Sequence, residues 1–286
     1  MENEGLSVIV CSIYPDRLKN LQGNIASTIG EAVDFEIIYK DNRTNPEPLA
    51  KVYNSLACKA QYKYLLFIHE DAGFESVGWY REIASKLKSP EVGLIGFAGG
   101  KLMGNAPSGW NQSEQYNVLN LTECGRIVKT NLDEGKAFSE VVTVDGFAMF
   151  VRREVWQKYP FDEVLLDGFH GYDTDFGLSV GSEFINYVSN NVRVFHNSTG
   201  NLDARWVETV VEMHKRKWSH ILPRVISSLN VSDNELRSEK ERAYYRLIKI
   251  MRDQGVKYPE IEHYFRTLPM SRRHIGHLLK LYIKYR

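Results

Sequence analysis

Short apolar runs alternate with longer amphipathic stretches through the first third of the chain. Four continuous apolar runs predict buried strands, at residues 6–11, 35–39, 64–68 and 92–97. Between these runs, apolar residues recur every three or four positions and predict helices, at residues 15–29, 46–60 and 78–88. This alternation predicts an α/β fold with a mostly parallel central sheet and flanking helices. We therefore expect the ends of the first three strands to lie along one edge of the sheet.

The pattern weakens between residues 98 and 140, where glycine and proline residues interrupt it. Long loops in compact domains usually bind ligands or act as lids, and we expect such loops here. A strand is then expected over residues 141–151, interrupted by Asp145-Gly146. Helices are then expected from about residue 153, over 176–180 and over 201–222. Two short strands are expected between the last two helices, over 184–188 and 192–196.

Composition excludes several classes of protein. The 286 residues carry 36 basic and 36 acidic side chains, so no net field favours nucleic acid, and no nucleic-acid partner is expected. Three widely spaced cysteines without a CxxC motif argue against a disulfide framework or a thiolate zinc site. The acidic start at residues 1–4 is no signal peptide, and no apolar run reaches the roughly 18–20 residues of a membrane span. We expect a cytoplasmic protein.

The most informative segment is His69-Glu70-Asp71, which directly follows the third predicted strand. Ligands of open α/β sheets bind just beyond the carboxyl ends of the strands. Acidic side chains there can hold a divalent cation against a nucleotide diphosphate, because Mg²⁺ and similar ions prefer oxygen ligands. An acidic surface turn is the other interpretation of the same three residues. The first strand is not followed by GxGxxG, which argues against a Rossmann dinucleotide site.

A series of further motifs occurs in a characteristic order around this segment. They are Ser7-Val-Ile-Val, Ser12-Ile-Tyr14, Asp41-Asn42, His69-Glu70-Asp71, Gly78-Trp79, Gly93-Leu-Ile-Gly96, Val144-Asp-Gly-Phe-Ala-Met-Phe-Val-Arg-Arg153, Phe161-Asp162, Tyr172-Asp-Thr-Asp-Phe176 and His196. With these motifs the chain, over roughly residues 5–200, resembles a family-two-like nucleotide-sugar glycosyltransferase of the GT-A fold. More narrowly, it is similar to the glycosyltransferase-like group related to the streptomycin-biosynthesis type.

The resemblance implies transfer of a sugar from a nucleotide-diphosphate donor to a glycan or other hydroxyl acceptor, with inversion at the sugar and with Mn²⁺ or Mg²⁺. Asp71 matches the second carboxylate of the family's Asp-x-Asp motif and is the expected metal ligand. His69 replaces the first carboxylate, and it could either coordinate the metal or be a structural histidine. His196 matches a histidine that closes the diphosphate site in some relatives, and a strand-end structural role is the alternative.

The resemblance also implies a set of donor-binding and catalytic residues. The expected donor contacts are Ser12, Tyr14, Asp41, Asn42, Glu70, Asp145 and Gly146. Asp173 aligns with the general base of inverting relatives, and Asp175 lies two residues further on. Both aspartates stand where a helix begins, so one could cap that helix while the other catalyses. His170 and Trp110 are candidate acceptor contacts, although each could be structural.

Residues 226–286 are interpreted as a helical extension of a glycosyltransferase-like domain that covers residues 1–225. In the last part, residues 271–286, apolar side chains at helical spacing lie among basic residues. Such a helix could lie in a membrane interface, at the inner face of the membrane, which would suit a lipid-linked acceptor. It could equally pack against the body of the protein or a partner.

Two other functions fit the same residues. One is a GT-A scaffold that binds nucleotide sugar or glycan without catalysis, as the replacement at His69 suggests. The other is a metal-dependent hydrolase built on His69, Asp71, His196 and Asp173.

Overall fold

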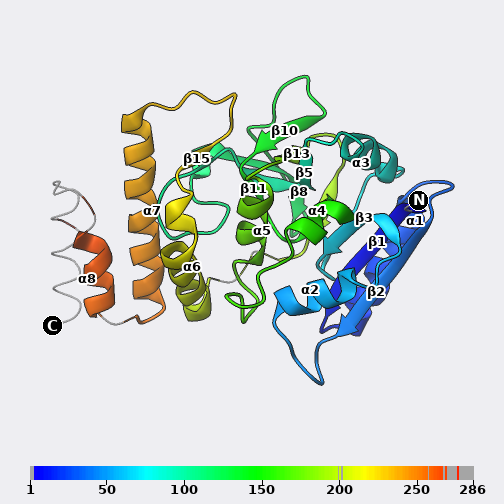
Figure 1. Ribbon diagram of the computed structural model, residues 1–286, viewed down its shortest axis with the longest axis horizontal. Coiled ribbons are helices and arrows are strands. Elements are labelled where there is room, and N and C mark those ends of the chain that lie inside the picture. The colour runs from blue at the N-terminus through cyan, green and yellow to red at the C-terminus, as the bar shows by residue number, and fades with distance from the viewer. Residues whose placement is uncertain are drawn as a thin grey trace.

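A seven-stranded sheet forms the centre of the computed structural model, which describes residues 3–198, 200, 202–256, 258–266, 268 and 276 (Figure 1). Its strands, in spatial order, are β10 (Phe138–Val141), β13 (Ile185–Ser189), β5 (Val92–Gly96), β12 (Ala148–Arg152), β3 (Tyr62–Ile68), β1 (Asn3–Ser12) and β2 (Phe35–Asp41). β1 runs parallel to β2 and β3, and β5 runs parallel to β13. β12 is antiparallel to both β3 and β5, and β10 is antiparallel to β13. The predicted α/β fold with a central sheet and flanking helices is confirmed. Five of the seven strands run in one direction, and β10 and β12 run in the other.

A second sheet lies over the carboxyl ends of the central strands. Its strands are β11 (Thr143–Val144), β6 (Ala98–Gly100), β8 (Asn117–Glu123), β14 (Val194–His196) and β4 (Ala72–Phe74), with β9 (Arg126–Thr130) paired to β8. β7 (Leu102–Met103) pairs separately with β15 (Arg224–Val225). The expectation of long loops between residues 98 and 140 was therefore wrong for much of that segment. β6 and β7 have only two or three residues, and the sequences of β8 and β9 show neither a continuous apolar run nor a regular alternation.

The strand expected over residues 141–151 is two strands in different sheets. β11 belongs to the second sheet, and β12 belongs to the central sheet. The turn between them, at residues 145–147, carries the chain from one sheet to the other. The Asp145-Gly146 interruption in the apolar run marks this crossing.

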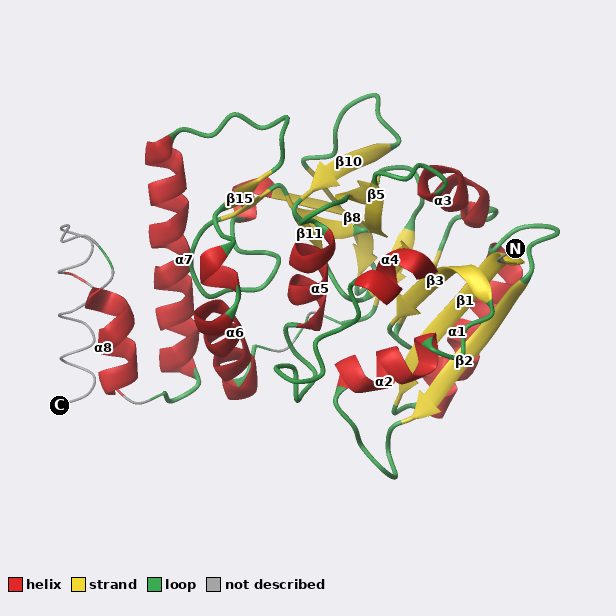
Figure 2. Ribbon diagram, viewed as in Figure 1, coloured by secondary structure: helices red, strands yellow, loops and turns green. Residues whose placement is uncertain are grey.

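The helices are α1 (Pro15–Thr28), α2 (Leu49–Ala57), α3 (Trp79–Leu87), α4 (Arg153–Lys158), α5 (Tyr172–Val180), α6 (Ala204–Arg216), α7 (Asp233–Asp253) and α8 (Tyr258–Arg266). α1 and α3 pack on one face of the central sheet, and α2, α4 and α5 pack on the other. α6 and α7 extend the second core beside the sheet, and α8 follows them (Figure 2). Strand β1 contributes to both cores, since Val8 and Val10 point to one and Ile9 to the other.

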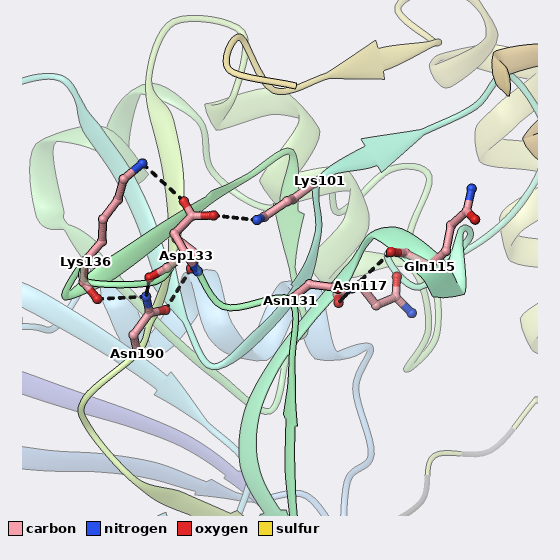
Figure 3. A network of polar contacts seen from close by, with 8 residues as sticks. Lys101, Gln115, Asn117, Asn131, Asp133, Lys136 and Asn190 are labelled. Atoms are coloured by element: carbon pink, nitrogen blue, oxygen red, sulfur yellow. Dashed lines mark hydrogen bonds and ion pairs between the residues drawn. The ribbon is translucent and has the colours of Figure 1, made fainter. Parts of the chain in front are cut away.

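Polar contacts fix the segment that follows β9 (Figure 3). Asp133 forms an ion pair with Lys101, with 2.6 Å between Oδ1 and Nζ. The Asn190 side-chain amide donates to the carbonyl oxygens of Asp133, at 3.2 Å, and Lys136, at 2.9 Å. The chain between β9 and β10 is thereby attached to the rest of the sheet.

The helical extension packs on the main body of the protein. α7 begins with a capping box formed by Ser232 and Glu235, and its apolar face joins the core that contains α6. Glu239 on α7 is 2% exposed and accepts a hydrogen bond of 2.9 Å from the Gln115 side chain. The domain boundary at residue 225 stays a prediction. The amphipathic helix expected over residues 271–286 lies outside the described residues, apart from Gly276.

Within the described part of the chain, none of the helices combines the length and the apolar character that crossing a bilayer requires.

Candidate active site

A cleft of about 690 Å³ opens at the carboxyl ends of β1 and β3. Its walls come from the loop after β1, the end of β3, the turn before β12, the start of α5, the end of β14 and parts of residues 109–128. Ser198, Gly200, Leu202 and Trp206 complete the lining on that side. This volume is within the range of ligand pockets for small molecules and cofactors. It lies at the sheet edge where the sequence predicts a site.

The end of β3 and the end of β14 bring three metal-competent side chains together. β14 pairs antiparallel with β4, which follows β3 directly, and His196 therefore lies opposite Ala72. In consequence, His69, Asp71 and His196 each offer a ligand atom within 4.8 Å of the other two. The His196 ring stacks on Phe147, with 4.6 Å between the ring centroids.

The Nε2 atom of His196 is buried and finds no hydrogen-bond partner among the described residues. It lies 3.5 Å from Asp71 Oδ1, at ion-pair distance but without hydrogen-bond geometry. A buried polar atom of this kind calls for an explanation, since nearly all such atoms in proteins are paired. A divalent cation between these side chains would satisfy it, and imidazole and carboxylate are suitable ligands for Mn²⁺.

Electrostatics favour the protonation states that metal binding requires. Burial, and then the neighbouring His196, lower the pKa of His69 to about 4, so its imidazole is neutral at physiological pH. Burial alone would raise the pKa of Asp71, but its interactions with His196, and then the weaker one with His69, outweigh burial and lower that pKa. Arg17 also approaches Asp71, with 3.5 Å between Nη1 and Oδ2. The group therefore combines the neutral His69 imidazole with the Asp71 carboxylate and the His196 ring, and it fits a divalent cation.

Glu70 holds the loop between β1 and α1. Its carboxylate accepts hydrogen bonds from the Ser12 hydroxyl at 2.5 Å and from the backbone N–H groups of Ile13 and Tyr14 at 3.1 Å. Ser12 is buried and does not line the cleft, whereas Glu70 and Tyr14 do. The Tyr14 side chain is half exposed, and the Arg17 guanidinium lies over its ring at 4.5 Å from the centroid.

Asp41 and Asn42, the two donor contacts predicted at the end of β2, have different positions relative to the cleft. Asn42 lines the cleft and closes a turn, since its side chain exchanges two hydrogen bonds of 3.0 Å with the backbone of Glu47. Asp41 does not line the cleft. It forms hydrogen bonds and an ion pair with Arg43, which lower the pKa of Asp41 to about 2.

The Tyr172 hydroxyl packs directly against the backbone of Gly146. A Cβ atom on Gly146 would lie 2.2 Å from the Tyr172 hydroxyl oxygen, so no other residue type fits without movement. The same hydroxyl lies 2.6 Å from His69 Nε2. The Gly146 N–H donates to Asp173 Oδ2 at 3.2 Å, and the Thr174 N–H donates to Asp173 Oδ1 at 2.7 Å.

Asp145 and Asp173 form a pair of carboxyl groups that both line the cleft. Burial, and then repulsion from Asp145, raise the pKa of Asp173 to about 7, although two backbone N–H groups oppose the shift. The pKa of Asp145 is also raised, chiefly by burial. A carboxyl with a pKa near neutrality is suited to proton transfer at physiological pH.

Asp175 has a different environment, although it stands only two residues from Asp173. It is 2% exposed and does not line the cleft. Its carboxylate accepts hydrogen bonds from Lys217 Nζ at 2.9 Å and from the Trp218 indole N–H at 3.0 Å. These contacts attach α5 to the segment after α6, so Asp175 stabilises the fold here.

The two candidate acceptor residues, His170 and Trp110, both line the cleft. His170 Nε2 lies 3.2 Å from Asp203 Oδ1, and burial lowers the pKa of His170. Two arginines in the lining, Arg17 and Arg246, are not among the residues expected from the sequence. The position of Arg17 in the first turn after β1 could have indicated it. No motif marks Arg246, which lies on α7.

Solved structures confirm the fold class. GalNAc-T7, determined with UDP, GalNAc and Mn²⁺, matches with a TM-score of 0.54 at 11% identity, over 92% of this chain and 56% of its own. TarS residues 1–349 from S. aureus match with a TM-score of 0.53 at 12% identity, over 92% of this chain and 78% of theirs. The mannosyltransferase PcManGT from Pyrobaculum calidifontis, in complex with GDP-Man and Mn²⁺, has a TM-score of 0.50 at 11% identity, over 96% and 78%. The chain thus spans little more than half the length of the GalNAc-T7 structure. The shared fold is GT-A.

Residues 7–215 match the glycosyltransferase-like family. The chain belongs to this family. No curated protein matches it significantly.

The raised pKa of Asp173 predicts a pH dependence of stability in the absence of ligands. Because the folded protein holds this proton more tightly than the unfolded chain, the contribution of Asp173 to the free energy of unfolding should fall as pH rises from about 4 to about 7. The Asp173→Asn variant should lose this fall, by at least about 1 kcal/mol, since one pKa unit corresponds to about 1.4 kcal/mol. Urea denaturation at a series of pH values measures it. Identical pH profiles of the two proteins would contradict the assignment.

Proposed function

We propose that the protein transfers a sugar from a nucleoside-diphosphate sugar to an acceptor hydroxyl in this cleft, with inversion at the sugar and with a divalent metal. One observation carries the proposal: a metal-competent group and a carboxyl suited to accept a proton line the same cleft of a GT-A fold. Membership of the glycosyltransferase-like family supports it. Complexes of the structural neighbours agree, since TarS was determined with UDP and UDP-GlcNAc, and PcManGT with GDP-Man.

Asp71, His196 and His69 are the residues that would hold the metal. His69 would coordinate through Nδ1, because its Nε2–H can then donate to the Tyr172 oxygen at 2.6 Å. Metal-bound histidines usually donate their second N–H to a partner in this way. When bound, the cation would neutralise the charge that develops on the departing diphosphate.

Tyr14, Asn42 and Arg17 are assigned to the donor. The half-exposed Tyr14 ring offers a face for the nucleobase. Asn42 is close to the same loop, because its backbone N–H donates to the Ser12 carbonyl oxygen at 2.8 Å. Arg17, beside Asp71, is positioned to contact the phosphates. Glu70 acts indirectly, since it fixes the loop that carries Tyr14. Ser12 and Gly146 are likewise assigned supporting positions around the donor rather than contacts with it. Asp41, which pairs with Arg43 outside the cleft, is not assigned a contact with the donor.

Asp173 is assigned as the general base. The acceptor hydroxyl oxygen would attack the anomeric carbon while the bond from that carbon to the diphosphate oxygen breaks, and the hydroxyl proton would pass to the Asp173 carboxylate. Attack from the side opposite the leaving group inverts the anomeric centre. The hydrogen bonds from Gly146 and Thr174 hold the carboxylate in place during this step. Asp175 is assigned a positioning role, through Lys217 and Trp218.

The acceptor is proposed to be a glycan, free or lipid-linked, as in polysaccharide biosynthesis. A cytoplasmic location, a peripheral membrane contact and the subgroup related to streptomycin biosynthesis remain predictions of the sequence.

Nucleotide binding should depend on the metal group. UDP or GDP with Mn²⁺ should raise the melting temperature, since a ligand at 100 times its Kd stabilises the folded state by about 2.7 kcal/mol. Asp71→Asn should remove the part of the shift that requires Mn²⁺. Glu114→Gln, which changes another acidic residue of the cleft lining, should keep it. A shift that is independent of Mn²⁺ in all three proteins would exclude this metal site.

Replacing the proposed base should separate catalysis from binding. Asp173→Asn should reduce sugar transfer by at least about 100-fold, the scale of general base catalysis, while the Kd of the nucleotide stays within about twofold. Asp175→Asn should retain transfer if it folds, because Asp175 does not reach the cleft. Release of nucleotide diphosphate and calorimetric titration measure the two quantities. Loss of transfer in Asp175→Asn with retained transfer in Asp173→Asn would reverse the assignment.

A further inference from the structure

Helix α7 contributes a guanidinium group to the cleft from outside the segment that matches the family. Arg246 lines the cleft, whereas the family match ends at residue 215. Its neighbours Tyr245 and Leu247 are buried in the core that α7 shares with α6, so the backbone at Arg246 is held firmly. The Arg246 side chain is half-buried, and its Nη1 donates to the Asn111 carbonyl oxygen at 2.7 Å.

Within the described part of the chain, no acidic side chain forms an ion pair with Arg246. Arg17, the other arginine of the lining, does form one, with Asp71. A guanidinium carries five N–H donors in a planar fork, and a single carbonyl accounts for one of them. Carboxylates and phosphates match this fork, and a half-buried, tethered arginine is well suited to bind them.

The position of Arg246 favours the acceptor over the donor. Asn111, to which Arg246 is bonded, adjoins Gly109, whose Cβ position would lie 3.9 Å from Thr174 Oγ1 and from the Trp206 ring. Thr174 directly follows the proposed base, Asp173. The donor diphosphate is instead assigned to the group of Asp71 and His196, where Arg17 supplies the cation.

We propose that Arg246 is a specificity-determining residue that binds an oxyanion on the acceptor, so that the enzyme prefers acceptors carrying a phosphate or a carboxylate near the reacting hydroxyl. This inference rests on the proposed function. The helical extension then completes the acceptor side of the cleft through two contacts of α7. Besides the bond to Asn111, the buried Glu239 holds Gln115, which follows the cleft residue Glu114.

The test uses the full chain saturated with UDP or GDP and Mn²⁺, whichever nucleotide binds, and measures sugar binding by titration of intrinsic fluorescence. The probes are glucose, glucuronic acid and glucose 6-phosphate. The wild type should bind at least one anionic sugar more tightly than glucose. Arg246→Gln should weaken that binding by about tenfold or more, the scale of a charge-assisted hydrogen bond, and leave glucose unchanged. The carboxylate and phosphate probes identify which oxyanion is preferred.

Two variants exclude simpler explanations. Arg246→Lys keeps the charge without the fork and should restore part of the affinity. Lys249→Gln removes a positive charge from an exposed position on the same helix and should behave as the wild type. Equal binding of charged and neutral sugars in the wild type, or anionic binding unaffected by Arg246→Gln, would overturn the inference. Failure of the wild type to bind either nucleotide would instead count against the proposed function.

Discussion

The site depends on a close approach between Gly146 and Tyr172. Because Gly146 has no side chain, the Tyr172 hydroxyl occupies the space where a Cβ atom would stand, at 2.2 Å. From there it reaches His69 at 2.6 Å, while the next residue, Asp173, accepts the Gly146 N–H. This one contact therefore joins the end of β3, the turn before β12 and the start of α5. The antiparallel pairing of β12 with β3, with Ala148 opposite Ile68, keeps the turn beside the end of β3.

Burial favours the neutral form of several titratable groups in the cleft. It raises the pKa values of Asp145 and Asp173 and lowers the pKa of His69, so each of these groups is driven toward its neutral form. Strong shifts of several neighbouring groups in one cleft are typical of functional sites. A divalent cation near Asp71 and His196 would favour ionised carboxylates nearby. The same arrangement thus costs stability in the free protein and becomes favourable when the site is filled.

Much of this arrangement was predictable from the sequence, because the long strands and helices have a strong periodicity. The strand that ends at Ile68 placed His69 and Asp71 at the sheet edge, and the motif order directed attention to Asp173 and His196. Of the second sheet, the segments of β11 and β14 were expected as strands, but β6, β8 and β9 were missed because their residues form no clear apolar run or alternation. The positions of Asp41 and Asp175 depend on local contacts that no sequence pattern reveals. Asp41 pairs with Arg43 outside the cleft, and Lys217 and Trp218 donate hydrogen bonds to Asp175. Arg246 was missed because a helix packing late in the chain brings it into the cleft.

Electron–nuclear double resonance on Mn²⁺ bound to the protein with UDP or GDP tests most directly whether one ion joins this histidine–aspartate group to the diphosphate. The spectrum should show hyperfine couplings to imidazole nitrogen and to phosphorus from the same ion, and the nitrogen couplings should weaken when His196 is replaced by glutamine. Phosphorus couplings without nitrogen would mean that Mn²⁺ is held by the nucleotide alone. That result would contradict the assignment of His69, Asp71 and His196 as the metal site.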